Sequence, residues 1–209
     1  MDDDQKNITA HKKADQIWVN ILLAGMFVGF LFYFIQDYMA TTRLSSLFMV
    51  IETAVIVVMF AIRAYPQRLS YAPYDWTIAL AGTWLPMLLR PSGALEDNEI
   101  LLGIQVFGIA LSTLGILSLN RSFGIVPAAR GVKTGGLYRF VRHPIYLGYV
   151  FSFTAITLQN FGVYNLVILI GILGADVLRI LAEEKFLAKD EAYRTYMSRV
   201  KWRVIPLIW

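Results

Sequence analysis

The stretch GGLYRFVRHPIYLGY, residues 135–149, decides the fold because it separates two long apolar segments. It places Arg139, Arg142 and His143 directly before Pro144. Proline is favoured at the first position of a helix, where the N–H that it lacks would have no partner. The stretch therefore predicts a helix that begins at Pro144 and a basic turn just outside an apolar segment.

The composition indicates a protein whose solvent is a lipid bilayer. Of the 209 residues, 57% are hydrophobic and 16% are charged, whereas soluble domains carry about 25% charged residues. The apolar residues cluster in long runs, so we expect an all-α integral membrane bundle of five to six transmembrane helices. Cysteine is absent and there are two histidines, so no disulfide, thiol nucleophile or metal site is expected.

The expected membrane segments are residues 17–35, 47–62, 76–89, 100–119, 144–158 and 164–181. The fifth is only about 15 residues long, whereas a full crossing needs about 20, which leaves the count at five or six. The sequence QNFG at 159–162 is typical of a turn. The last two segments are therefore expected to form a helical hairpin with a short or tilted first arm.

The C-terminal region predicts an amphipathic helix. Phe186, Tyr193, Met197 and Val200 recur at helical spacing. We expect the last membrane helix to continue out of the bilayer as this amphipathic helix until about Val200. The sequence VIPLIW at 204–209 is expected to pack back or to lie at the interface.

The basic residues predict the topology. The loop 120–143 holds five basic residues and no acidic one, and the C-terminal tail is also basic. The positive-inside rule then places both termini in the cytoplasm, for a bacterial inner membrane or the endoplasmic reticulum. The acidic N-terminus lacks a cleavage pattern, so no signal peptide is expected. Topology explains the basic excess, so no nucleic-acid partner is expected.

Two charged groups are expected to meet at the cytoplasmic end of the hairpin. The helix start at Pro144, flanked by Arg142 and His143, is suited to an anion. Glu183 and Glu184 stand where the last membrane helix leaves the bilayer and are suited to a cation. A ligand that carries both a positive and a negative charge, such as the amino-acid moiety of S-adenosylmethionine, would match these two groups. In the alternative interpretation, the basic loop only sets the topology and touches anionic lipids.

Further ionisable residues lie within the apolar segments. Asp176 and Arg179 are three residues apart and could form an intrahelical ion pair, while Arg179 and Glu183 are four apart and could also pair. Ionisable groups in a membrane segment are costly enough to suggest a site. Glu52 is interpreted mainly as a hydrogen-bonding residue between helices.

The stretch GLYRFVRHPIYLGY (136–149), followed by AEEKFLAKDEAYRTYMSRVKWRVIP (182–206), resembles the isoprenylcysteine carboxyl methyltransferase and phospholipid methyltransferase superfamily of membrane methyltransferases. The shared pattern is an Arg-His-Pro-x-Tyr-x-Gly turn, a Glu-Glu pair at the end of the next helix, spaced tyrosines, and a basic residue before a proline. The resemblance covers about residues 120–206. It divides the chain into N-terminal transmembrane helices, 1–119, and a cofactor-binding catalytic portion of the same membrane domain, 120–209.

The resemblance implies a methyltransferase that binds S-adenosylmethionine at the cytoplasmic face and takes a lipophilic isoprenoid or lipid acceptor from the bilayer. It implies that residues 124–136 wrap the adenosine. The implied catalytic residues are Glu184, Tyr196 and Arg203. The implied cofactor-binding residues are Tyr138, Arg142, His143, Pro144, Tyr146, Gly148, Glu183, Glu184 and Tyr193.

Two other functions remain open on the sequence alone. Sterol or isoprenoid reductases of similar architecture use NADPH, and the basic loop could hold its 2′-phosphate. A non-enzymatic protein that binds anionic lipid would also carry such a loop. The chemical group of the methyl acceptor and the oligomeric state are left open.

Overall fold

The computed structural model of the chain describes residues 3–90 and 98–209, with side chains from residue 17 onward. The acidic N-terminal side chains, on which the expectation about a signal peptide rests, lie outside the described residues.

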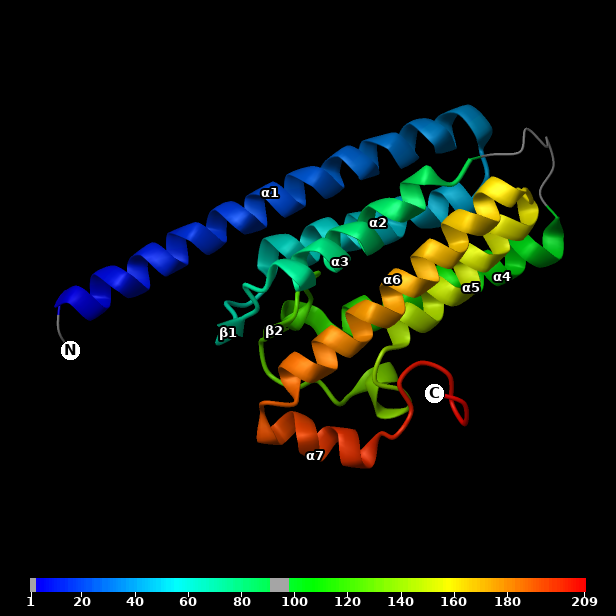
Figure 1. Ribbon diagram of the computed structural model, residues 1–209. Coiled ribbons are helices and arrows are strands. Elements are labelled where there is room, and N and C mark those ends of the chain that lie inside the picture. The colour runs from blue at the N-terminus through cyan, green and yellow to red at the C-terminus, as the bar shows by residue number, and fades with distance from the viewer. Residues whose placement is uncertain (1–2, 91–97) are drawn as a thin grey trace.

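Helices form most of the described chain and run alongside one another as a bundle (Figure 1). The all-α membrane bundle is therefore confirmed. The elements in chain order are α1 (Asp3–Thr41), α2 (Leu44–Ile62), β1 (Arg68–Leu69), α3 (Pro73–Trp84), α4 (Glu99–Leu119), β2 (Ala128–Ala129), α5 (Pro144–Gln159), α6 (Val163–Leu187) and α7 (Glu191–Arg199).

Four helices are long and apolar enough to cross a membrane, and they cover residues Ile17–Thr41, Leu44–Ile62, Glu99–Ser122 and Val163–Leu187. Two further helices of the bundle are shorter, since α3 has 12 residues and α5 has 16. A full crossing needs about 20 residues. The predicted number of five to six transmembrane helices therefore depends on whether these two short helices cross the membrane. Both lie beside the long helices (Figure 1).

Helices α4 and α5 approach so closely that their backbones touch. A Cβ atom built at Gly108 of α4 would lie 2.6 Å from the carbonyl oxygen of Gly148 in α5. A Cβ built at Gly148 would lie 2.5 Å from the carbonyl oxygen of Gly108 and 2.6 Å from the backbone nitrogen of Ser112. Small residues at such a crossing allow tight van der Waals packing between membrane helices. This contact fixes α5, and with it the turn at residues 142–144, against α4.

The expectation of a continuous helix from the last membrane segment to Val200 is wrong. Helix α6 ends at Leu187, and α7 begins at Glu191 as a separate element. The side chain of Asp190 accepts a hydrogen bond from the backbone nitrogen of Ala192 at 2.9 Å and so caps α7. An N-cap aspartate has non-helical dihedral angles, so the chain turns here and α7 lies at the end of the bundle (Figure 1).

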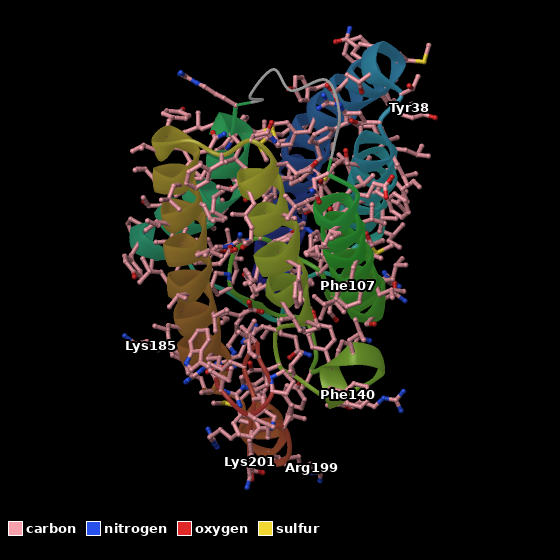
Figure 2. All side chains as sticks on the ribbon, turned by 90° about the vertical axis from the view of Figure 1, so that its right-hand side faces the viewer. Tyr38, Phe107, Phe140, Lys185, Arg199 and Lys201 are labelled. Carbon is pink, nitrogen blue, oxygen red and sulfur yellow. The ribbon has the colours of Figure 1, made fainter. Side chains whose placement is uncertain are left out.

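The loops that follow α2 and α4 meet at the same end. Strands β1 and β2 pair antiparallel, with Arg68 opposite Ala129 and Leu69 opposite Ala128. Figure 2 shows Lys185, Arg199 and Lys201 at this end of the bundle, opposite the end that carries Tyr38. We refer to this end, which holds α7, β1 and β2, as the basic end.

The close contact of α4 and α5 predicts a position-specific effect of adding one methyl group. Gly148→Ala should lower the free energy of unfolding by about 1–3 kcal/mol because backbone atoms must move apart. Gly103→Ala is the matched control, since a Cβ there meets nothing within 4 Å. Thermal unfolding in detergent measures both variants. Equal melting temperatures would contradict this account of the α4–α5 contact.

Candidate active site at the basic end of the bundle

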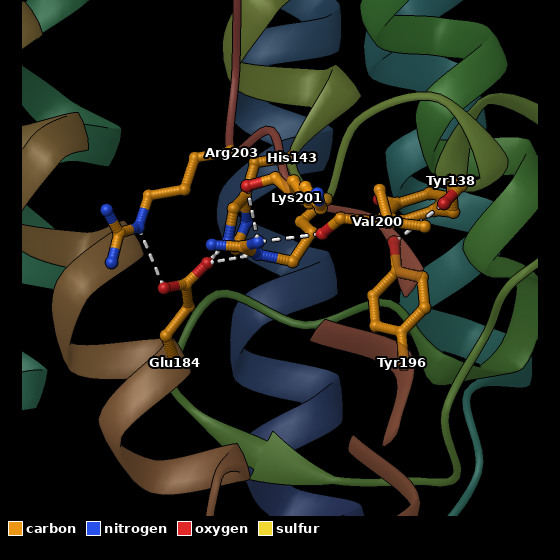
Figure 3. A network of polar contacts seen from close by, with 8 residues as sticks. Tyr138, His143, Glu184, Tyr196, Val200, Lys201 and Arg203 are labelled. Atoms are coloured by element: carbon orange, nitrogen blue, oxygen red, sulfur yellow. Dashed lines mark hydrogen bonds and ion pairs between the residues drawn. The ribbon is translucent and has the colours of Figure 1, made fainter. Parts of the chain in front are cut away.

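One buried carboxylate joins three basic side chains at the basic end (Figure 3). Oε1 of Glu184 accepts a hydrogen bond from Nε of Arg142 at 2.7 Å and lies 3.2 Å from Nε2 of His143. Oε2 of Glu184 accepts from Nε of Arg203 at 2.8 Å. The predicted meeting of residues 142–143 with the acidic pair is therefore present in the structure. Since Glu184 is already shared among these groups, it acts here as the centre of a network.

The C-terminal tail covers the start of α5. The backbone nitrogen of Arg142 donates to the carbonyl of Trp202 at 2.9 Å, and that of His143 donates to the carbonyl of Arg203 at 2.8 Å. Nη1 of Arg142 also donates to the carbonyls of residues 200 and 201 (Figure 3). Pro144 is fully buried. The helix start that was expected to present an anion site to the cytoplasm is therefore enclosed by the tail.

A large cavity, cavity 1, runs from the basic end into the bundle and has about 1100 Å³ of space, part of it open to the outside. Apolar side chains of α1 and α2, including Phe27, Phe30 and Ile56, line its deeper part. Near the basic end, Tyr138 and His143 contribute to its wall. Its lining is mostly apolar with a few polar groups, as is typical of ligand sites.

A second cavity, cavity 2, has about 640 Å³ of space and is bounded by the loop after α4. Arg130 and Lys133 contribute positive charges to its lining, and Glu183 and Asp190 contribute negative ones. Nε of Arg130 donates to the carbonyl of Ala64 at 3.0 Å, which holds the loop against the end of α2. Burial lowers the pKa of Arg130 to about 10, so its guanidinium remains charged at neutral pH.

The two cavities meet at Glu183. This half-buried residue lines both cavities, as do Tyr138, Tyr193 and Gly124. One carboxylate therefore faces a mostly apolar space inside the bundle and a polar space beneath the loop. Such a junction can hold a polar ligand in cavity 2 with one end directed toward an apolar ligand in cavity 1.

A cluster of tyrosines closes the junction from the side of α7. Oη of Tyr196 donates a hydrogen bond to the carbonyl oxygen of Tyr138 at 2.7 Å (Figure 3). Burial raises the pKa values of Tyr138, Tyr193 and Tyr196. These hydroxyls therefore remain protonated at neutral pH, so the arrangement does not favour Tyr196 as a proton acceptor.

The residues implied by the resemblance separate into two groups. The first group lines cavity 1 and consists of Tyr138, Arg142, His143, Tyr146, Glu183 and Tyr193. The second group lines neither cavity 1 nor cavity 2 and consists of Pro144, Gly148, Glu184, Tyr196 and Arg203. The second group supports the site through packing, the Glu184 network and the bond from Tyr196 to Tyr138.

The structure adds polar residues that the resemblance did not assign. Arg179 and Glu52 both line cavity 1, and Glu52 accepts a hydrogen bond from the Ser112 hydroxyl. The signal for Arg179 was its position four residues before Glu183, since residues at this spacing share a helix face. Among the described residues, no cluster of three or more acidic, histidine or cysteine side chains could hold a metal ion.

The fold and the paired cavities define a membrane protein with a charged site at one end of a helical bundle. Residues 100–194 match the family described as phospholipid methyltransferase. This family is part of the superfamily that the sequence resembles, so the predicted resemblance is confirmed over these residues. Among curated proteins, no match to the chain was found.

The Glu184 network predicts a large loss of stability when its charge is removed. Glu184→Gln leaves the buried guanidinium of Arg142 without a counter-charge, which should cost about 3–5 kcal/mol. Glu183→Gln, the adjacent substitution in the half-buried junction, should change stability by less than about 1 kcal/mol. Thermal unfolding of both variants in the same detergent tests this difference. Similar melting temperatures would show that Glu184 does not hold the site together.

The buried tyrosines predict a loss of stability at high pH. Above pH about 10, the unfolded chain releases each tyrosine proton while the folded chain retains it. The free energy of unfolding should then fall by about 1.4 kcal/mol per pH unit for each such tyrosine. Tyr196→Phe should make this fall less steep by that amount, as measured by unfolding between pH 9 and 11. Tyr71→Phe, at an exposed tyrosine, is the control, and an identical slope in both variants would contradict the prediction.

Proposed function

We propose that the protein is an S-adenosylmethionine-dependent methyltransferase that acts on a lipophilic isoprenoid or lipid acceptor. The observation that carries this proposal is the junction at Glu183, where a cavity with charged lining residues under the basic loop adjoins a mostly apolar cavity inside the bundle. The match of residues 100–194 to phospholipid methyltransferases supports the same chemistry.

Cavity 2 has the charges that an amino-acid moiety requires. Glu183 or Asp190 can hold an ammonium group, and Arg130 or Lys133 can hold a carboxylate. Gly131 has a φ of 87°, a left-handed conformation that favours glycine and shapes the loop around the cavity. When bound, S-adenosylmethionine supplies a methyl group on a sulfonium centre, which is already a good leaving group.

The protein would contribute position and exclusion of water. Tyr138 and Tyr193 line the junction, and the Glu184 network fixes His143 in the wall of cavity 1. Orientation of two reactants in a closed site is a large part of catalysis for such transfers. The acceptor is expected to enter cavity 1 from the bilayer, with its apolar part among the phenylalanines of α1.

The basic end is proposed to face the cytoplasm. The loop 120–143 carries five basic residues and no acidic one, and Lys185, Arg199 and Lys201 lie at the same end (Figure 2). Positively charged segments are retained on the cytoplasmic side. The methyl donor would then reach cavity 2 from the cytosol.

Calorimetric titration of the detergent-solubilised protein with S-adenosylmethionine tests the proposal. Glu183→Gln should weaken binding by about tenfold or more, because a charge-assisted contact is lost. Glu191→Gln, at an exposed acidic residue of α7 that lines neither cavity 1 nor cavity 2, should leave affinity unchanged. Labelled methyl groups should also pass to a component of a membrane lipid extract.

Parallel titration with NADPH distinguishes the reductase alternative. Binding of NADPH without binding of S-adenosylmethionine would overturn the proposal. Binding of neither, together with full stability of Glu183→Gln, would favour a protein that only binds anionic lipid.

A further inference from the structure

Arg179 is a cation whose side chain is only 11% exposed, although it belongs to a helix apolar enough to cross the membrane. It belongs to the membrane-spanning portion of α6 and lines cavity 1. Glu183 lies four residues later on the same helix, which places the two about 6 Å apart along the axis. Arg179 therefore stands about one helical turn deeper in the membrane than the junction where cavity 2 opens.

Three neighbours on three helices hold this guanidinium in place. The ring of Tyr146 on α5 lies 5.3 Å from the guanidinium carbon, within the range of a cation–π contact. Gly82 on α3 leaves room for the side chain, since a Cβ there would lie 2.8 Å from Cδ and 2.9 Å from Nη1 of Arg179. Nη1 also lies 3.6 Å from Oδ1 of Asp176, one turn back on α6.

Several polar atoms of Arg179 and Asp176 make no hydrogen bond with the residues that the structure describes. Among the described residues, no hydrogen-bond partner is present for Nε of Arg179 or for either carboxylate oxygen of Asp176. Arg142, the other arginine of cavity 1, instead donates to Glu184 and to two carbonyls of the tail. Arginine carries five donors in a fixed fork that matches carboxylate and phosphate oxygens. A charged residue within a membrane helix is costly and marks a functional site by default.

We infer that Arg179 binds an acidic group, a carboxylate or a phosphate, of the lipophilic methyl acceptor, an inference that rests on the proposed methyltransferase function. The acidic group meets the guanidinium from the side of cavity 1, while Asp176, which is absent from the described lining of that cavity, orients Arg179 from behind. The apolar part of the acceptor extends toward the phenylalanines of α1. Arg179 is therefore a specificity-determining residue that selects anionic lipids over neutral ones.

Glu52 offers the competing chemistry in the same cavity. Its carboxylate, held by the hydroxyl of Ser112, would suit a cationic lipid instead. Arg179 is favoured because its Nε lacks a hydrogen-bond partner in the described part of the chain, whereas Glu52 already accepts a hydrogen bond from Ser112. The two possibilities predict opposite orders of binding for anionic and cationic amphiphiles of the same chain.

Binding of four labelled amphiphiles to the full chain in an uncharged detergent tests the inference. Oleate carries a carboxylate, oleoyl lysophosphatidate a phosphate, oleyl alcohol no charge, and oleylamine a positive charge. The wild-type protein should bind at least one of the two anions about tenfold more tightly than oleyl alcohol. The tighter of the two anions identifies carboxylate or phosphate as the acidic group.

Variants test whether the preference for anionic amphiphiles depends on Arg179. Arg179→Gln should abolish the preference for the anion, and Arg179→Lys should retain part of it. Gly82→Ala should reduce it severalfold by displacing the guanidinium, whereas Gly103→Ala, where a Cβ meets nothing within 4 Å, should leave it intact. If Arg179→Gln fails to fold, the Gly82→Ala variant and the wild-type binding order still decide the question.

The outcomes separate this inference from the proposed function. Equal binding of all four amphiphiles, tightest binding of oleylamine, or an anion preference that persists in Arg179→Gln would overturn the assignment of Arg179. Titration of the same samples with S-adenosylmethionine reports on the methyltransferase proposal independently. Loss of donor binding with an intact, Arg179-dependent anion preference would refute the enzyme proposal and retain the anionic lipid site.

Discussion

The carboxylate of Glu184 is the contact on which the rest of the site depends. It joins α6 to the turn before α5 through Arg142 and His143, and to the C-terminal tail through Arg203. Two of these partners are arginines with long, flexible side chains, and leaving a buried charge without its partner is costly. The network therefore fixes three segments that are far apart in the sequence, and the walls of both cavities follow from their positions.

The two parts of the bundle contribute different residues to the two cavities. Helices α4 to α7 and the loop after α4 supply the charged residues of the junction, and this region includes the match to phospholipid methyltransferases. Helices α1 and α2 supply a further share of the apolar lining of cavity 1. Under the proposed function, the C-terminal portion would provide the chemistry, and α1 and α2 would influence the shape of the lipid that fits.

The sequence predicted the elements whose signals are local. Pro144 begins α5 as expected, and the turn at 159–162 brings His143 and Glu184 within 3.2 Å. The tail was expected to pack back or to lie at the interface, but its contact with residues 142–143 was not predicted, because it uses backbone N–H and carbonyl groups, which nearly every residue type shares. The resemblance implied that Gly148 binds the cofactor, whereas in the structure Gly148 packs against Gly108. A match to a motif does not distinguish a glycine that packs from one that binds a ligand.

The contact of residues 202–203 with residues 142–143 has a consequence for biosynthesis. Helices α5 and α6 are synthesised before this tail. A nascent chain that ends after α6 therefore still lacks residues 202–203, which lie over the start of α5. Until the tail emerges, Arg142 has only part of its final set of acceptors. The contacts of Arg142 with the carbonyls of residues 200 and 201 therefore form only after α5 and α6 have been synthesised.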